Sequence, residues 1–262
     1  MPDATQHDRT IVDQHNRQAA GYARLADSLA QKDRSATLRA RIGAGPEDEA
    51  LDVACGPGRL TLDLAPHVRR IIGLDLTPGM LEQARAALAA SGAGNVAFVQ
   101  GDAAALPFAD AAFSLVISSA AFHHFAAPGR VLAEMARVCR PGGRIVVSDV
   151  TPAEDKAAEY DRMERLRDPS HGHAHSLVEL AELGRAAGLG APEVHTGLTG
   201  PMPYAAVLAT SFPEAATREN LLEMMRQDAA EGRDRLGFRA ALGEDGAVLV
   251  SYPMSQVVWV RP

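Results

Sequence analysis

The sequence predicts an α/β protein with a Rossmann-like, doubly wound sheet. Strand-like apolar runs alternate with helix-like segments from Glu49 to Val150, the pattern of consecutive βαβ units. Most of these runs are apolar throughout, as expected where helices cover both faces of a sheet. The first run leads into a turn holding Gly56 and Gly58. A strand, a glycine turn and a helix in this order form a common ligand-binding element of α/β folds.

Each element is supported by local signals. The predicted strands of the first part span residues 50–54, 70–75, 95–100, 113–118 and 144–150. Thr77 and Pro78 are expected to open one helix, with Thr77 as its cap, and Pro128 another. A turn at Arg140–Gly143 precedes the fifth strand. After Val150 the pattern favours helices at 153–166, 177–187 and 204–235, a strand at 193–197 and two strands within 247–260.

The chain of 262 residues is long enough for one large domain with an added cover. We expect residues 1–45 to form an N-terminal helical cover, because helical spacing runs from Thr10 to about Ile42. Residues 46–150 then form the half of the sheet that contains the glycine turn and binds its ligand. Residues 151–262 supply C-terminal strands of the same domain and helices that line a pocket for a second molecule.

Composition argues for a small-molecule partner in the cytoplasm. The formal net charge of −7 is opposite to that of most proteins that bind nucleic acid nonspecifically, so no nucleic-acid partner is expected. The two cysteines, Cys55 and Cys139, show no zinc or disulfide spacing. The N-terminus lacks the apolar core of a signal peptide, and no apolar run is long enough for a membrane span.

Two acidic residues indicate what the glycine turn binds. Asp75 ends the second predicted strand and Asp102 follows the third. A dinucleotide fingerprint needs glycine or alanine where this chain has Thr61, and it has no use for Asp102. S-adenosylmethionine uses every part: Asp75 can accept hydrogen bonds from its ribose hydroxyls and Asp102 from its adenine amino group. Asp52, just before the turn, can attract its ammonium group.

Six segments carry a family resemblance: Leu51–Gly58, Gly73–Leu81, Gly101–Ala103, Leu106–Phe108, Phe113–Phe125 and Arg137–Gly143. Through them the chain resembles class I S-adenosylmethionine-dependent methyltransferases, and within them the small-molecule group that includes the ubiquinone and menaquinone C-methyltransferases. The resemblance implies a seven-stranded sheet whose last strand is antiparallel, which Ser255–Val260 would supply. It also implies that Tyr22 covers the cofactor and that the segment after Ile117 lines its methyl end. The expected cofactor contacts are Tyr22, Asp52, Ala54, Gly56, Gly58, Asp75, Leu76, Met80, Asp102, Ala103 and Ser118.

Histidines are the candidate catalytic residues, because an acceptor that loses a proton needs a base near neutral pH. His123 and His124 follow the fourth strand, at the sheet edge where α/β proteins bind ligands. The stretch from Arg167 to His171 is similar to one in related methyltransferases, which implies His171 or Asp168 at the acceptor pocket. His173 and His175 could join His171 as metal ligands, but no metal site is expected, because no carboxylate or cysteine completes the set.

We therefore predict a methyltransferase acting on a small acceptor, a quinone, phenol or heteroaromatic ring. An NAD(P)-dependent oxidoreductase and a catalytically silent S-adenosylmethionine-binding protein are the alternatives from other classes. Within methyltransferases the closest rival is an enzyme that methylates amines or amino acids on nitrogen. A homodimer is compatible with the sequence.

Overall fold

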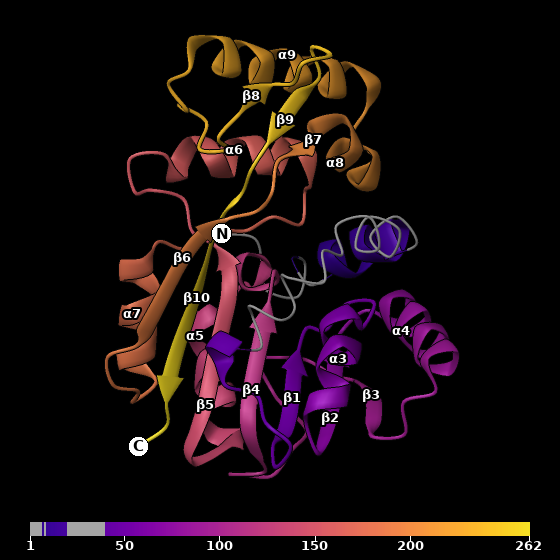
Figure 1. The fold of residues 1–262 in the computed structure, drawn as a ribbon, viewed down its shortest axis with the longest axis vertical. Helices are drawn as coiled ribbons and strands as arrows, with labels where there is room; N and C mark the ends of the chain where they lie inside the picture. The colour runs from indigo at the N-terminus through magenta and orange to yellow at the C-terminus, as the bar shows by residue number, and fades with distance from the viewer. Residues whose placement is uncertain (1–6, 8, 20–39) are drawn as a thin grey trace.

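The computed structural model describes residues 7, 9–19 and 40–262. Its main element is a seven-stranded sheet in the order β3-β2-β1-β4-β5-β10-β6 (Figure 1). The first five strands pair in parallel, and β10 is antiparallel to both of its neighbours. The predicted doubly wound sheet with an antiparallel last strand is therefore confirmed. The strands are β1 (Glu49–Val53), β2 (Arg70–Asp75), β3 (Val96–Gln100), β4 (Phe113–Ser119), β5 (Cys139–Val150), β6 (Glu193–Leu198) and β10 (Pro253–Val260).

Helices cover both faces of this sheet, which explains why its central strands are apolar throughout. On one face, Leu132 and Met135 of α5 pack with Leu180 of α7 against the strands. On the other, Leu64 of α3 packs with Ile42. The helices of this part are α3 (Arg59–Leu64), η1 (Ala65–His67), α4 (Pro78–Ser91), η2 (Phe122–His124), α5 (Pro128–Val138) and α7 (Leu177–Ala186).

A second layer lies over the carboxyl ends of the parallel strands (Figure 1), and we call it the cap. It combines three helices with a small sheet in the order β7-β9-β8. Tyr160, Tyr204, Met225 and Phe238 are buried in its own apolar core. The cap elements are α6 (Ala157–Arg167), β7 (Met202–Pro203), α8 (Tyr204–Ser211), α9 (Ala215–Glu231), β8 (Ala241–Leu242) and β9 (Val248–Val250).

Two details differ from the sequence prediction. Only β10 of the two C-terminal strands joins the main sheet, because β9 pairs with β7 and β8 in the cap. Strand β5 begins at Cys139 instead of 144, since Cys139 pairs with Phe113 before a shift in register. The predicted turn at Arg140–Gly143 is thus an irregularity within the strand, where Gly142 takes φ +73°.

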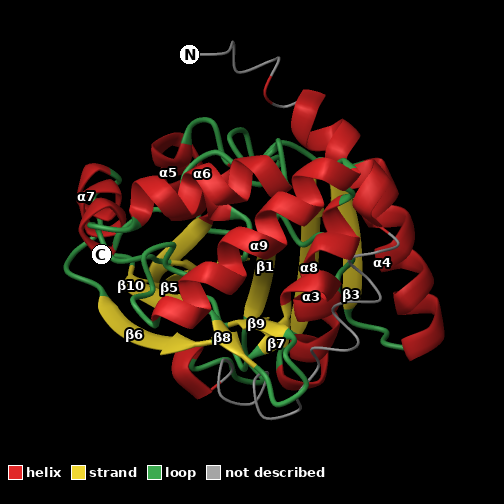
Figure 2. Ribbon diagram, turned by 90° about the horizontal axis from the view of Figure 1, so that it is seen from above, coloured by secondary structure: helices red, strands yellow, loops and turns green. Residues whose placement is uncertain are grey.

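Residues 9–19 are helical, as predicted, and lie between the cap and the sheet (Figures 1 and 2). The Asn16 side chain accepts a hydrogen bond from the backbone N–H of Gly79 (3.0 Å), and Gln18 donates one to Asp168 (3.1 Å). This segment therefore connects α4 to the loop after α6. Residues 40–42 are helical as well, whereas Tyr22 falls outside the described residues. The described helices are too short or too polar to span a bilayer.

A substitution at Gly58 would test how tightly the glycine turn packs on the sheet. It has φ +79°, and an added Cβ would lie 2.6 Å from the Phe98 ring. Gly58→Ala should lower the free energy of unfolding by about 2–4 kcal/mol, through left-handed strain and overpacking. Gly92→Ala is the matched control, because Gly92 has φ +69° with open space around it. It should cost only about 1–2 kcal/mol. Equal losses in urea denaturation would contradict the packing role of Gly58.

Candidate active site

A cavity of about 570 Å³ opens over the carboxyl ends of β1, β2 and β4. Its wall combines the glycine turn, the ends of the neighbouring strands and the segment around His124, and Ile11 and His15 close it from the N-terminal helix. Ligands of open α/β sheets bind at this edge. The expected site residues on its wall are Asp52, Ala54, Gly56, Asp75, Leu76, Met80, Asp102, Ala103 and His124.

The backbone of the glycine turn is shaped for a close ligand. Ala54 and Gly56 take φ +58° and +54°, and an added Cβ on Gly56 would meet nothing within 4 Å. Ala120, at the end of β4, also has a positive φ of +52° and lines the cavity. Left-handed conformations of residues other than glycine are costly and gather at functional sites. Gly58 differs, because its missing side chain makes room for Phe98 and not for a ligand.

The Asp75 carboxylate joins two parts of the cavity wall. One oxygen accepts the backbone N–H of Gly56 and the other the backbone N–H of Thr77, both at 2.8 Å. Each carboxylate oxygen can accept a further hydrogen bond. Neither Asp75 nor Asp102 forms an ion pair with any described residue. Asp75 is therefore oriented by the backbone while it still has acceptor capacity for hydroxyl groups in the cavity.

Thr77 and Asp102 complete this wall. The predicted helix start is confirmed, with Thr77 at the N-cap and Pro78 next, but no capping hydrogen bond from the Thr77 side chain is found in the described structure. The Asn16 side chain accepts the Gly79 amide instead, and the buried Thr77 hydroxyl is left without a described partner. One Asp102 oxygen accepts the backbone N–H of Ala104 (2.8 Å). Thr77 is a polar wall residue that the sequence analysis assigned only to capping.

Asp52 is a buried carboxyl group beside Asp75. It is 1% exposed and accepts a hydrogen bond from the Thr61 hydroxyl at 2.6 Å. Burial raises the pKa of Asp52 to about 7, with a further rise from Asp75 and an opposing effect from the Thr61 hydrogen bond. A cation in the cavity would stabilise its ionised form. An ammonium or sulfonium group next to Asp52 fits this environment.

The three candidate catalytic histidines have different surroundings. His124 lines the cavity, and its Nδ1 lies 2.9 Å from the carbonyl oxygen of Ser170. His123 Nδ1 is 2.7 Å from Asp149, and His171 Nε2 is 2.8 Å from Asp161. Burial lowers the pKa of both His124 and His171 below the usual value, whereas Asp149 raises that of His123 against the effect of burial. Only His124 of the three is on the described cavity wall.

The other histidines of this loop do not join His171. His173 lies 2.6 Å from Asp161 and 3.1 Å from Glu179, on the outer side of the same carboxylate that holds His171. His173, His175 and Glu179 form a half-buried group whose polar atoms lie within 4.8 Å of one another. Glu179 is thus a carboxylate in range of these histidines, which the sequence analysis did not find.

Some expected site residues lie behind the wall or outside the described structure. Gly58, Ser118, His123 and His171 are not among the described lining residues, and Ser119 lines the cavity in place of its neighbour Ser118. The buried Ser118 hydroxyl has no described partner. The wall also contains Arg59 and Arg130, which the sequence analysis did not select.

Comparisons with known proteins agree with this geometry. Residues 51–147 match the family model of a methyltransferase domain. The methyltransferase YcgJ of Bacillus subtilis is 30% identical over 202 residues, which cover 76% of this chain and 79% of YcgJ. The crystal structure of YcgJ has a TM-score of 0.76 and 27% identity, and the match covers 88% of this chain and all of that one. A demethylmenaquinone methyltransferase of Beutenbergia cavernae is 39% identical over 116 residues, 44% of this chain and 46% of that protein.

The chain belongs to the class I S-adenosylmethionine-dependent methyltransferases. Its cofactor is S-adenosylmethionine, and the cavity fits that molecule. The turn leaves open space beside Gly56, the Thr77 hydroxyl has no described partner, and Asp52, Asp75 and Asp102 all line the same cavity. These groups match the hydroxyls, amino group and cationic end of the cofactor.

Asp75 is expected to contribute directly to cofactor affinity. Asp75→Asn should weaken binding of S-adenosylhomocysteine by about 10–100-fold, because the amide keeps the shape but loses charge-assisted hydrogen bonds. Isothermal titration would measure this. Asp63→Asn is the matched control, since Asp63 lines the same cavity but pairs with Arg59 at 3.2 Å. Equal weakening in both variants would indicate a general charge effect and contradict a specific role for Asp75.

The raised pKa of Asp52 predicts that the free energy of unfolding depends on pH. The pKa is higher in the folded chain, about 7, than in the unfolded chain, near 4. The folded state then holds a proton that the unfolded state releases, so its stabilising contribution is lost as pH rises through about 7. Asp52→Asn should remove this loss, about 2–3 kcal/mol between about pH 5 and pH 8. Urea denaturation of the ligand-free protein measures it, and parallel pH curves for both proteins would contradict the assignment.

Proposed function

We propose that this enzyme methylates a small ring-shaped acceptor of the quinone, phenol or heteroaromatic type. One observation carries the proposal: the cavity that contains Asp75 and Asp102 continues without a break to His124 and Phe125. A cofactor bound at the carboxylates would therefore share one continuous cavity with an acceptor at His124. The proposal covers transfer to carbon, oxygen or nitrogen of such a ring.

The acceptor end of the cavity suits an apolar, planar molecule. Beyond the aspartates its wall is formed mainly by small and apolar side chains. Such surfaces bind aromatic rings, and a few polar groups fix their orientation. The similarity to demethylmenaquinone methyltransferases supports the same class of acceptor. The apolar wall residues are Ala120, Ala121, Phe125, Val131 and Met254.

The chain's contribution to transfer is position and exclusion of water. S-adenosylmethionine, when bound, supplies an electrophilic methyl group. Asp75 and Asp102 would fix the nucleoside end, and Asp52 would neutralise the cationic end. Holding two reactants in line accounts for much of the acceleration of such displacements. Ile11 and His15 of the N-terminal helix cover part of the cavity. Exclusion of water beneath them would strengthen these electrostatic contacts.

His124 would contact the acceptor's polar atom. If its Nδ1–H donates to the Ser170 carbonyl, its Nε2 carries the free lone pair. Burial, together with the nearby His123 and His15, lowers the pKa of His124 well below the usual value, so the ring is neutral near pH 7. A neutral imidazole can accept the proton of an acidic hydroxyl or enol group, or it can ligate an ion that binds the oxygen of that group. His123 and His171, tied to Asp149 and Asp161, would position this segment.

The acceptor class is tested by measuring release of S-adenosylhomocysteine with a panel of phenols, reduced quinones, heteroaromatic rings and aliphatic amines. We expect turnover with at least one ring compound and none with aliphatic amines. Transfer to amines alone would contradict the proposed acceptor class. Cofactor binding without turnover on any compound of the panel would favour a silent binding protein.

His124 should affect turnover without affecting cofactor affinity. His124→Gln is expected to lower kcat with the best ring acceptor by about 100-fold or more, the range for a group that acts on the transferred proton or charge. The Kd for S-adenosylhomocysteine should stay within about twofold, since the cofactor groups lie elsewhere on the wall. His195→Gln, at a partly exposed histidine on β6, is the control. Unchanged kcat in His124→Gln would remove His124 from the acceptor site.

A further inference from the structure

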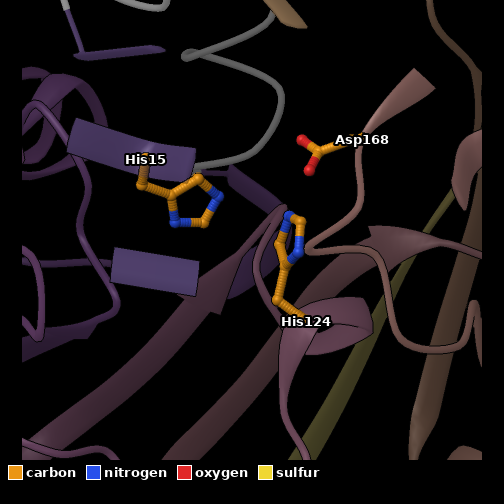
Figure 3. Close-up of side chains that lie close together, drawn as sticks. All are labelled: His15, His124 and Asp168. Carbon is orange, nitrogen blue, oxygen red and sulfur yellow. The ribbon is translucent and has the colours of Figure 1, made fainter. Parts of the chain in front are cut away.

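Three side chains from distant parts of the sequence converge at the acceptor end of the cavity. His15 comes from the N-terminal helix, His124 from η2 and Asp168 from the loop after α6. Figure 3 shows the two rings and the carboxylate directed toward one another. One ligand atom from each, a ring nitrogen or a carboxylate oxygen, lies within 4.8 Å of the other two. Small side-chain rotations would bring all three atoms onto one ion.

Hydrogen bonds hold two of these groups, His124 and Asp168, in place. His124 Nδ1 lies 2.9 Å from the carbonyl oxygen of Ser170, which leaves Nε2 as the ligating nitrogen. One Asp168 oxygen accepts the backbone N–H of Ser170 (2.9 Å) and the Ser170 hydroxyl (2.5 Å). The other accepts Nε2 of Gln18 at 3.1 Å. Protein metal sites use this kind of support, in which backbone carbonyls and polar side chains orient the ligands.

A polar atom beside the cluster has no partner among the described residues. Gln18 is fully buried, and its Oε1 makes no hydrogen bond there, although its Nε2 is bonded to Asp168. Burying a carbonyl oxygen without a partner is costly. A water molecule bound to a metal ion would donate a hydrogen bond to an oxygen in this place. This orphaned acceptor is an observation independent of the three converging side chains.

The charge states of the cluster also match a cation. Burial lowers the pKa of His15 and, together with His123, that of His124, so both rings are neutral near pH 7. Burial works against ionisation of Asp168, but Arg167 and the Ser170 hydrogen bonds keep its pKa below the usual value. Two neutral imidazoles and one carboxylate form the donor set of sites for divalent first-row transition metals that keep open positions.

We propose that His15, His124 and Asp168 bind a divalent first-row transition metal ion at the acceptor end of the cavity. His15 and His124 line that cavity, so the open coordination positions would face it. An acceptor with a phenol or enol oxygen could occupy one of them, a use of the ion that rests on the proposed function. Metal binding itself depends on neither cofactor nor acceptor.

The second histidine group provides the matched control. His173, His175 and Glu179 offer a similar set of donors but are only half-buried. His173 is already engaged on both ring nitrogens, with Asp161 and Glu179. The three residues therefore test whether metal binding is specific to the inner cluster or a general property of histidines in this region.

The test is titration of the full chain, freed of metal by chelation, with Co²⁺ followed by its visible absorption, and with Zn²⁺ in competition. We expect one ion per chain, with affinity reduced more than about 100-fold in His124→Gln, His15→Gln and Asp168→Asn. Ser170→Ala and Gln18→Ala change the supporting contacts and should cost about 10–100-fold. His173→Gln and His175→Gln should bind as the wild type does.

Absence of a stoichiometric site, or loss of binding in the His173 and His175 variants instead, overturns the proposal. Thermal unfolding shows whether each variant is folded. If the Asp168→Asn variant does not fold, the conservative His15→Gln variant decides the outcome. Turnover separates this proposal from the previous one. Metal binding without methyl transfer to any ring acceptor would contradict the proposed function and leave the metal site intact. Transfer by a chain that binds no Co²⁺ would contradict the metal site alone.

Discussion

The cavity wall around the glycine turn depends on the Asp75 carboxylate at the end of β2. Its two oxygens accept backbone N–H groups from Gly56 and Thr77, and so tie the glycine turn after β1 to the start of α4. The parallel pairing of Val53 with Leu74 makes this possible, because it brings the ends of β1 and β2 to the same level. The turn, the helix start and the acceptor oxygens of Asp75 are thereby fixed together by contacts within the chain.

The His124 end of the cavity depends on a different kind of contact, between segments that are remote in the chain. The N-terminal helix contacts α4 through Asn16 and the loop after α6 through Gln18. His7 lies 2.8 Å from the backbone oxygen of His124, on the segment that follows β4. These contacts close an open sheet edge into a cavity. A doubly wound sheet alone offers only a crevice at this edge.

The sequence was sufficient to predict the main sheet, because apolar runs, proline and glycine signals report local structure reliably when both faces are buried. Asp75 and Asp102 could be selected because each follows a strand. The small sheet of the cap was missed, since two of its strands have only two residues and leave no periodic signal. The role of Gly58 in packing against Phe98 depends on a contact between neighbouring strands and the turn, which local spacing does not contain.

The cluster of His15, His124 and Asp168 could not be predicted from the sequence. No local pattern connects these positions. The sequence analysis considered metal binding only for the histidine-rich stretch from 171 to 175. In the structure Asp161 keeps His171 and His173 apart, because it contacts His171 with one carboxylate oxygen and His173 with the other. Which remote side chains meet is decided by tertiary packing of the N-terminal helix and the cap. The spacing of residues along the chain does not specify such long-range contacts.

A crystal structure of the full chain with S-adenosylhomocysteine would test the role of Asp75. We expect the ribose hydroxyls within hydrogen-bonding distance of Asp75 and the adenine amino group at Asp102, with the thioether sulfur facing the His124 end of the cavity. A nucleoside bound elsewhere, or one bound here with Asp75 directed away from the ribose, would contradict that role.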